Sequence, residues 1–383
     1  MHQLPIRILH FFGNLSSSGG AEKWFLDLMR LNDSRIHFDF LTSICDKTLE
    51  DEINSLGSVV HRVPFSRSPF PLSCFNSYLN SVRNILRTNK YDAVHVHQFD
   101  LSGEILRIAA EENVSTRLIS IHSSNYDNTR IHRRLVYYLF GRRWIFHYAT
   151  NILPCSNLAA ESFNCVNLSK TKIIYPSINP EYFKIDNSKR AELQTKYKNF
   201  FNIPQDAIVI GHIGRFTQLK NHQFLIQLLA DMIYQNEKIY AVLVGTGELF
   251  EKIRQNIIDA GIEKHVILTG KRDDVPAIIG TLFDVLVLPS LYEGLPIAAI
   301  ESLAMGLNVV YSDKISQELD QFFPTRIFRE KLEINNWIET ILKAVKSRIE
   351  PEKAMIELIN SPFAIQFSLE KLIEIYTRNF HKN

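Results

Sequence analysis

The segment 285–306, VLVLPSLYEGLPIAAIESLAMG, decides the fold. Its apolar start, Val285–Leu288, predicts a buried strand, and Pro296 stands where a helix begins, because the first helical turn tolerates proline's missing N–H. Glu293 then lies in the connecting loop, and Glu301 lies one to two turns into the helix. Amides at such a helix start can bind phosphate or sugar oxygens, and both carboxylates can accept hydrogen bonds from hydroxyl groups. Without the surrounding sequence, a loop acid and a helix-surface acid would be the default interpretation.

Strand and helix patterns alternate on both sides of this segment through the second half of the chain. Such alternation implies a mostly parallel sheet with helices on both faces. The predicted strands are Ile208–Ile213, Ala241–Val244, Val266–Thr269, Val285–Leu288 and Val309–Tyr311. The predicted helices are His222–Gln235, Leu249–Ala260 and Ala298–Ala304. The polar stretch Pro180–Pro204 is expected to add a helix and a loop near the junction with the first half.

The first half of the chain follows the same pattern. Its predicted strands are Arg7–Phe12, His37–Thr42, Val59–Val63, Ala93–His97, Arg117–Ile121 and Asn151–Cys155, and the stretch Glu22–Leu31 has helical spacing. We therefore predict an α/β fold of two doubly wound, Rossmann-like domains, residues 1–175 and 176–364. Sheets of this kind bind ligands beyond the carboxyl ends of their strands.

Cations and glycines follow the predicted strands at these ends. Arg215 and Lys220 come after Ile208–Ile213 and together can neutralise a diphosphate and stabilise it as it leaves. Two solvated surface charges are the evenly weighted alternative. Gly20, after the first strand, can bring a helix-start amide to a phosphate, and Val244–Glu248 (VGTGE) leaves room for a ligand. For both glycine segments a plain turn is at least as good an interpretation.

Composition narrows the class of protein. The chain has 383 residues, 22% of them charged, with a formal net charge of +2, which argues against a nucleic-acid binder. The four cysteines lack metal-ligand spacing, so neither a zinc site nor a disulfide framework is expected, and a reducing compartment fits. No apolar run reaches the roughly 18 residues that cross a bilayer, and no signal peptide is recognisable. These features predict a cytoplasmic protein.

Two motifs connect these segments to a known family. Leu268–Asp274 reads LTGKRDD, and Glu293 and Glu301 stand at the two ends of a Glu-x7-Glu motif. The chain resembles the family 4 retaining glycosyltransferases, above all the bacterial members that build capsule, O-antigen and other surface polysaccharides. The similarity runs nearly end to end and is strongest from Gly211 to Asp313. It implies a GT-B architecture, with two Rossmann-like domains facing a central cleft and a last helix, within 365–383, that crosses back to the first domain.

The resemblance also implies roles for individual residues. Glu301 would hold the donor ribose, Glu293 and the following amides would hold the transferred sugar, and His122 would orient that sugar without acting as a nucleophile. Lys271 and Arg272 would border the base through backbone contacts. The implied donor-binding residues are Gly20, Arg215, Lys220, Lys271, Arg272, Glu293, Gly294, Leu295, Ile297 and Glu301, and the implied catalytic residues are His122, Glu293, Arg215 and Lys220.

The implied reaction retains the anomeric configuration, needs no cofactor and needs no metal. The leaving phosphate would accept the proton of the acceptor hydroxyl, and the chain has neither a Ser-His-Asp set nor an Asp-x-Asp metal motif. The sequence departs from its relatives at two places. Pro176 leads into Ser177-Ile178-Asn179 where a Pro-Asn-Gly turn is usual, and Ser124 replaces a second histidine. These departures affect the hinge, the sugar pocket or the acceptor, but not the reaction class.

Arginines and aromatic residues gather in the region 128–160, which has no acidic residue before Glu161. The arginines are Arg130, Arg133, Arg134, Arg142 and Arg143. They suit an anionic inner-membrane surface or an undecaprenyl-diphosphate-linked acceptor, while an amphipathic helix packed on the first domain is the equal alternative.

Two other functions fit the same architecture. A nucleotide-sugar epimerase would carry extra acids and histidines for proton abstraction. A catalytically silent nucleotide-sugar-binding subunit would have lost some of Arg215, Lys220, Glu293, Glu301 and His122. The preferred interpretation is a transferase of a hexose-type sugar from a UDP- or GDP-linked donor to a glycan or lipid-linked glycan.

Overall fold

Two parallel sheets of the Rossmann type make up the fold. The computed structural model describes residues 5–16, 20–63, 72–97, 101–122 and 141–378. The chain divides into unit 1, which is Met1–Pro176 with Ile365–Asn383, and unit 2, which is Ser177–Ala364.

The sheet of unit 2 has six parallel strands in the order β11-β10-β9-β12-β13-β14. Their bounds are β9 Ile208–Ile213, β10 Ile239–Val244, β11 Val266–Gly270, β12 Val285–Leu288, β13 Asn308–Ser312 and β14 Ile327–Glu330. All five predicted strands are present. The sixth, β14, was not predicted, because its sequence IFRE has only two apolar residues and its burial comes from pairing at the edge, beside β13. The chain order reverses between β9 and β12, which makes this the topological switch point of the sheet.

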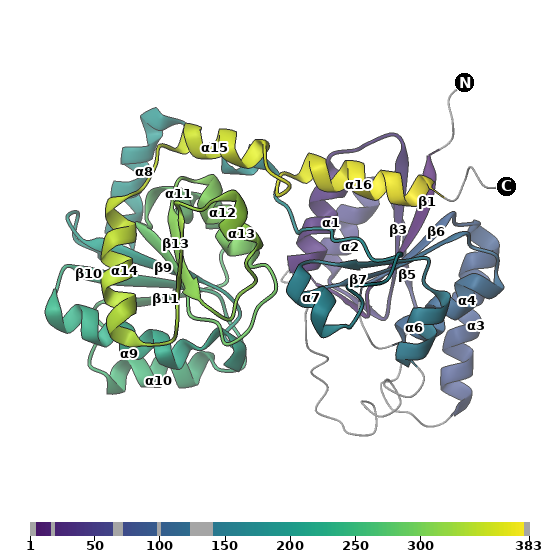
Figure 1. Ribbon diagram of the computed structural model, residues 1–383, viewed down its shortest axis with the longest axis horizontal. Coiled ribbons are helices and arrows are strands. Elements are labelled where there is room, and N and C mark those ends of the chain that lie inside the picture. Colours follow the sequence, from purple (N-terminus) through teal and green to yellow (C-terminus); the bar gives the residue numbers. More distant parts are fainter. Residues whose placement is uncertain (1–4, 17–19, 64–71, 98–100, 123–140, 379–383) are drawn as a thin grey trace. The chain divides into compact units, whose positions relative to one another are not determined.

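Helices cover both faces of this sheet (Figure 1). On one face lie α9 His222–Gln235, α10 Phe250–Asp259 and α14 Ile334–Lys346, and on the other lie α8 Asn187–Phe200, α11 Val275–Thr281, α12 Ile297–Ala304 and α15 Pro351–Ile359. Shorter helices are η2 Pro180–Phe183, η3 Gln218–Lys220 and α13 Glu318–Phe322. Trp337 of α14 and Leu225 of α9 are fully buried against the central strands, so these helices and the sheet share one apolar core.

The sheet of unit 1 has the same topology, β5-β3-β1-β6-β7-β8. Its strands are β1 Ile6–Phe11, β3 Ile36–Thr42, β5 Val60–Arg62, β6 Ala93–Val96, β7 Thr116–Ile121 and β8 Asn151–Pro154, which match the six predictions within one or two residues at each end. A short parallel pair, β2 Asn14–Leu15 and β4 Ile44–Cys45, was not predicted. The switch point of this sheet lies between β1 and β6.

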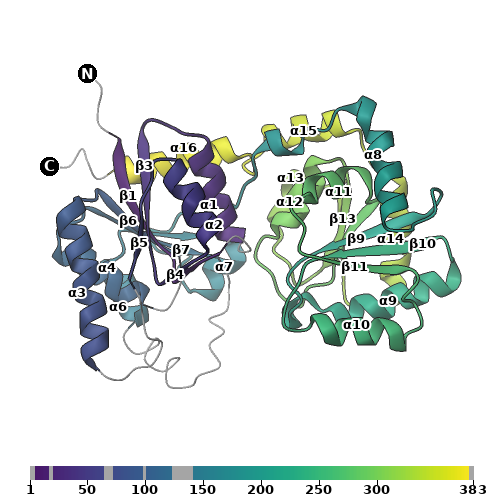
Figure 2. The same ribbon diagram turned by 180° about the vertical axis from the view of Figure 1, so that it is seen from behind.

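Two layers of helices also cover the sheet of unit 1. One face carries α3 Leu72–Asn89, α4 Ser102–Glu111, α6 Arg142–Tyr148 and α7 Asn157–Ser162, and the other carries α1 Gly20–Arg30, α2 Lys47–Ser55 and α16 Ile365–Thr377. Figure 2 shows α16, the last helix of the chain, beside α1. Leu372 and Tyr376 of α16 are fully buried in the core beneath α1.

Candidate functional site

Two loops meet at the switch point of unit 2. One is Gly214–Lys220, which follows β9, and the other is Pro289–Pro296, which follows β12. The backbone amide of Leu291 donates a hydrogen bond of 2.8 Å to the carbonyl of Leu219 and joins the two loops. Both loops leave the carboxyl ends of their strands, the edge at which this class of sheet binds ligands.

An ion pair spans this switch point. Lys220 Nζ lies 2.5 Å from Glu293 Oε1, and the two side chains are 18% and 21% exposed. The Ser290 hydroxyl donates to the other carboxylate oxygen, Oε2, at 3.0 Å, and the Ser312 hydroxyl donates to the Ser290 carbonyl at 2.5 Å. The sequence placed Lys220 and Glu293 at one ligand, and the structure brings their charged groups into direct contact.

Arg215 and Gly214 complete the loop after β9. Arg215 is exposed and has no ion pair within the part of the chain that the structure describes. The Lys220 stem covers Gly214, where an added Cβ would lie 3.1 Å from Lys220 Cε. Arg215 is therefore exposed to solvent, and Gly214 leaves the space that the Lys220 side chain occupies.

The remaining predicted donor-binding residues of unit 2 divide into two groups. Glu301 is only 5% exposed on α12, Gly294 and Leu295 are buried in the preceding loop, and Ile297 is the first residue of α12. Lys271 is exposed after β11. Arg272 donates two hydrogen bonds to the Asp274 carboxylate, at 2.8 and 2.6 Å, so its guanidinium is held within its own loop.

The glycine turn after β10 has a structural explanation. A Cβ at Gly245 would lie 2.0 Å from the Gly214 carbonyl oxygen, and one at Gly247 would lie 2.5 Å from the carbonyl oxygen of Phe216. These glycines allow one backbone segment to pack directly on the loop that carries Arg215. Backbone packing alone therefore explains these glycines, and no ligand is needed to account for them.

In unit 1, Gly20 is the exposed first residue of α1 and His122 directly follows β7. His122 Nε2 lies 3.1 Å from His97 Nδ1, and His97 Nε2 lies 2.9 Å from His10 Nδ1. Burial lowers the pKa of His122 to about 4 and that of His10 to about 3, and it holds the pKa of His97 well below the usual range. All three rings are therefore neutral at physiological pH.

Sequence reasoning missed the buried histidines around both switch points. His10, His95 and His97 lie on β1 and at the end of β6, and the alternation of His95 and His97 in AVHVHQ places both on one face of the sheet. In unit 2, His212 donates from Nδ1 to the Val287 carbonyl at 2.8 Å, and its pKa is lowered by burial to about 4. Histidines at the carboxyl ends of parallel strands were the available signal.

Three of these histidines offer nitrogen atoms within 4.8 Å of one another, as a metal site would: His10, His95 and His97. The hydrogen bonds of His95 weigh against this use. Its Nδ1 lies 2.8 Å from the Tyr376 hydroxyl and its Nε2 lies 2.8 Å from the Ser120 hydroxyl, so both ring nitrogens have hydroxyl partners. The absence of a metal requirement stays a prediction.

Only part of the predicted basic surface falls within the described residues. Arg130, Arg133 and Arg134 lie outside them. Arg142 donates to the Phe163 carbonyl at 3.0 Å and stacks over the Phe146 ring at 5.0 Å, so it packs inside unit 1, whereas Arg143 is exposed. Among the described residues, no helix combines the length and the hydropathy that crossing a bilayer requires.

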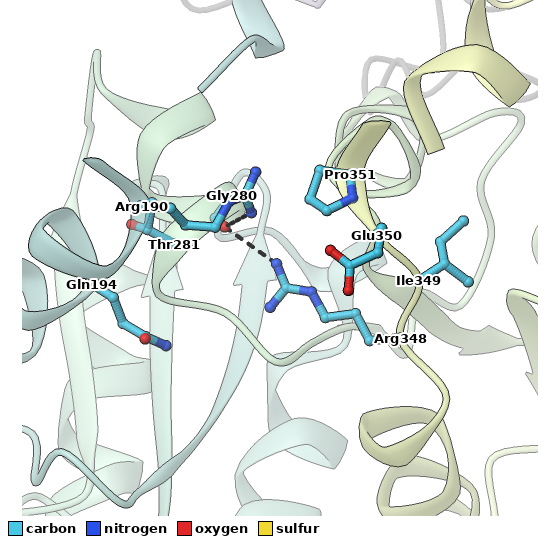
Figure 3. A pocket seen from close by; sticks show the side chains of 8 residues that line it. All are labelled: Arg190, Gln194, Gly280, Thr281, Arg348, Ile349, Glu350 and Pro351. Carbon is cyan, nitrogen blue, oxygen red and sulfur yellow. Dashed lines mark hydrogen bonds between the residues drawn. The ribbon is translucent and has the colours of Figure 1, made fainter. Parts of the chain in front are cut away.

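A cavity of about 310 Å³ lies in unit 2 near the amino end of β12, away from the loops that carry Lys220 and Glu293 (Figure 3). Arg190 and Arg348 converge there on the Gly280 carbonyl, at 2.6 and 3.2 Å, and Arg348 also reaches the Phe283 carbonyl at 3.4 Å. Gly280 lies in the last turn of α11, where cations complement the negative end of the helix dipole. The two arginines therefore have a structural role at the carboxyl end of α11.

Comparisons with known proteins identify the family of this chain. Residues 194–358 match the family model described as glycosyl transferases group 1, and residues 18–182 match the model described as glycosyltransferase family 4. EpsF of Bacillus subtilis is 30% identical, covering 100% of this chain and 99% of that protein. The capsular polysaccharide biosynthesis glycosyltransferase CapH of Staphylococcus aureus is 26% identical over 97% of this chain and 98% of its own. The UDP-Gal:alpha-D-GlcNAc-diphosphoundecaprenol alpha-1,3-galactosyltransferase of Escherichia coli is 26% identical over 78% of each chain.

A solved structure shares this fold. Anabaena HepE, crystallised with UDP, superposes with a TM-score of 0.77 at 17% identity, covering 98% of this chain and 100% of that one. Two Rossmann-like units that match glycosyltransferase family models define a glycosyltransferase of the GT-B class. The chain belongs to family 4 of these enzymes.

Proposed function

We propose that this chain is a retaining, metal-independent glycosyltransferase of surface-polysaccharide biosynthesis. It takes a hexose-type sugar from a UDP- or GDP-linked donor. The observation that carries the proposal is the ion pair between Lys220 and Glu293 at the switch point of unit 2, beside the exposed Arg215. The relatives named for capsular polysaccharide synthesis and for transfer from UDP-galactose support the same class of donor and product.

The donor is bound by charge and by hydroxyl recognition. Lys220 has three N–H donors, so it can keep Glu293 and also donate to a phosphate oxygen, and Arg215 offers a second, planar cation. Glu293 accepts from a sugar hydroxyl and Glu301 accepts from the ribose hydroxyls. Lys271 and Arg272 border the base, while Gly20 and His122 of unit 1 contribute an amide to the phosphate and a ring to the sugar.

The reaction breaks one bond and forms another at the same carbon. The bond between the anomeric carbon and the diphosphate oxygen breaks, and an acceptor hydroxyl bonds to that carbon from the same face, through an oxocarbenium-like state. The acceptor proton passes to the departing phosphate oxygen. Lys220 and Arg215 stabilise the charge that grows on this leaving group, so catalysis consists of positioning and electrostatics.

The acceptor is a glycan or an undecaprenyl-diphosphate-linked glycan, as the name of the Escherichia coli relative supports. Such a lipid lies in the bilayer, so the enzyme would work on the cytoplasmic face of the inner membrane as a peripheral protein. Arg143, which is exposed on α6, is available for an anionic headgroup, whereas Arg142 is engaged inside unit 1.

Thermal unfolding with a panel of UDP-, GDP- and ADP-sugars, without added metal, tests the proposal. A ligand that binds the native state raises Tm according to its affinity. We expect one donor to raise Tm, and Glu301→Ala and Lys220→Ala each to abolish the shift. Lys238→Ala is the matched control, because Lys238 forms an exposed ion pair with Asp206 at the opposite edge of the sheet. A shift that survives both site substitutions would refute the proposed contacts.

A further inference from the structure

A row of three histidines runs from the core of unit 1 to its ligand-binding edge. His10 lies on β1, His97 directly follows β6 and His122 directly follows β7. The nitrogen-to-nitrogen distances are 2.9 Å from His10 to His97 and 3.1 Å from His97 to His122. His10 is fully buried and His97 nearly so, while His122 is partly exposed. The row therefore connects a sealed interior to the edge where unit 1 would meet its substrate.

Each of these rings has one N–H and one bare nitrogen. Burial keeps all three neutral, and a neutral imidazole donates from one nitrogen and accepts at the other. Each short contact in the row needs one donor and one acceptor. The tautomer of one ring therefore dictates the tautomers of the other two.

Two assignments satisfy the row. In the outward assignment, His10 Nδ1–H donates to His97, His97 Nδ1–H donates to His122 Nε2, and His122 carries its proton on Nδ1. In the inward assignment every bond is reversed, and His122 Nδ1 is bare. The two assignments differ in what His122 offers a ligand: a donor in the first, an acceptor in the second.

The inner end of the row favours the outward assignment. His10 Nε2 is buried and has no hydrogen-bond partner among the described residues. The centroid of the His10 ring lies 4.7 and 4.5 Å from those of Phe25 and Phe38. It lies 5.2 Å from that of His95, whose two nitrogens are already engaged by the hydroxyls of Tyr376 and Ser120. The inward assignment would leave an N–H there without an acceptor, and among buried backbone groups an orphaned N–H is rarer than an under-satisfied acceptor.

We propose that His97 is a positioning residue that holds His122 in the Nδ1–H tautomer, so that His122 donates a hydrogen bond to an oxygen of the sugar substrate. The assignment of a substrate contact to His122 rests on the proposed function. The ring of His97 is itself fixed by stacking on Phe12 at 4.2 Å and by Phe25 at 4.4 Å. The tautomer of the buried His10 thus determines, through His97, the tautomer of His122 at the ligand-binding edge.

Long-range ¹H–¹⁵N NMR of protein labelled at histidine tests the tautomer without any substrate. The cross peaks from the ring carbons' protons to the two nitrogens distinguish Nδ1–H from Nε2–H, and His122→Gln assigns the signals. We expect Nδ1–H in the native protein and a mixture of tautomers in His97→Phe, whose ring can keep the stacking on Phe12. His61→Phe is the control, because His61 pairs with Tyr91 elsewhere in unit 1. Native Nε2–H, or an unchanged tautomer in a folded His97→Phe, would overturn the proposal.

Transfer kinetics separate this proposal from the proposed function. His97→Phe should lower kcat roughly tenfold, the equivalent of one hydrogen bond, with little change in the KM for the donor. His61→Phe should leave both constants unchanged. If His122→Gln retained full transfer activity while the native tautomer was Nδ1–H, the sugar contact would be refuted but the tautomer coupling would stand. If the protein transferred no sugar, the NMR result would still decide the coupling.

Discussion

Lys220 and Glu293 are 73 positions apart in the sequence, yet their charged groups are 2.5 Å apart. The two side chains are mostly buried, so the cost of desolvating them offsets much of their attraction, and the pair is weak evidence for stability. Its chemical value is that each member keeps hydrogen-bonding capacity for a ligand. At the residue scale, single neighbours determine the chemistry of the site: Lys220 pairs with the charge of Glu293, and His97 would set the proton position of His122.

Replacing Glu293 with glutamine should separate binding from folding. Glu293→Gln keeps the shape of the side chain but removes a charge-assisted acceptor, which is worth about 1.5–3 kcal/mol. We expect kcat/KM for transfer to fall about 10- to 100-fold while Tm changes little. Glu181→Gln, in an exposed pair with Lys184, is the matched control and should alter neither quantity. Unchanged kcat/KM in Glu293→Gln would remove this carboxylate from the mechanism.

The buried histidines predict a loss of stability in mild acid. The pKa of His10 is about 3 and that of His212 is about 4 in the folded protein, both lowered by burial from 6.5. Between pH 6.5 and 4 the unfolded chain binds more protons than the folded one, so stability is full above 6.5 and falls as the pH decreases. Each such histidine contributes a slope of up to about 1.4 kcal/mol per pH unit.

Urea denaturation at a series of pH values measures this slope. The free energy of unfolding should decrease steadily from pH 6.5 to about pH 5, the part of the interval that lies above the ordinary pKa values of carboxyl groups, about 4. His10→Phe should flatten the slope, because it removes one of the groups that gain a proton on unfolding. A free energy that stays constant over this interval would show that folding does not lower the pKa values of these histidines.

At the scale of elements, glycines set how closely strands and loops approach. Gly211 lies in the centre of β9, and a Cβ there would lie 2.1 Å from the ring of Phe283, which is fully buried before β12. Gly211 and Phe283 therefore form one packing unit beneath the switch point. The loops that carry Arg215 and Glu293 leave the ends of these same two strands.

Gly211→Ala should destabilise the protein by about 1–3 kcal/mol, the usual cost of an overpacked core. Phe283→Leu alone removes packing volume and also destabilises. In the double variant the alanine methyl group occupies space that the smaller leucine leaves. The double variant should therefore lose less unfolding free energy than the two single variants lose together. Chemical denaturation of the four proteins checks this coupling, and strict additivity would contradict the contact.

At the scale of the whole molecule, the two units differ in how the chain builds them. Unit 2 is the continuous segment Ser177–Ala364, whereas unit 1 is completed by Ile365–Asn383, almost 190 residues after its first part ends. Ile365, Leu372 and Tyr376 of α16 are buried in the core of unit 1, and the Tyr376 hydroxyl lies 2.8 Å from His95 Nδ1. The last helix is therefore part of the first domain's core.

Separate expression of the two units tests this division. We expect residues 177–364 to fold alone and to unfold cooperatively. Residues 1–176 should show a broad, low-temperature transition, because removing α16 uncovers apolar core. Adding residues 365–383 to the end of the 1–176 fragment, through a flexible linker, should restore a sharp transition. A cooperative transition of 1–176 without α16 would contradict the role given to the helix.

The sequence by itself determined the fold class, eleven of the strands and the segments that carry Arg215, Lys220, Glu293 and Glu301. Hydrophobic periodicity and short motifs are local properties of the chain, so they can be recognised from the sequence alone. Tertiary structure decided the rest. The edge strand β14 has too few apolar residues to be recognised, and the direct contact between Lys220 and Glu293 depends on the adjacency of β9 and β12. The histidine row likewise depends on three separate strands, because only the pairing of β1 with β6 and of β6 with β7 brings their carboxyl ends side by side.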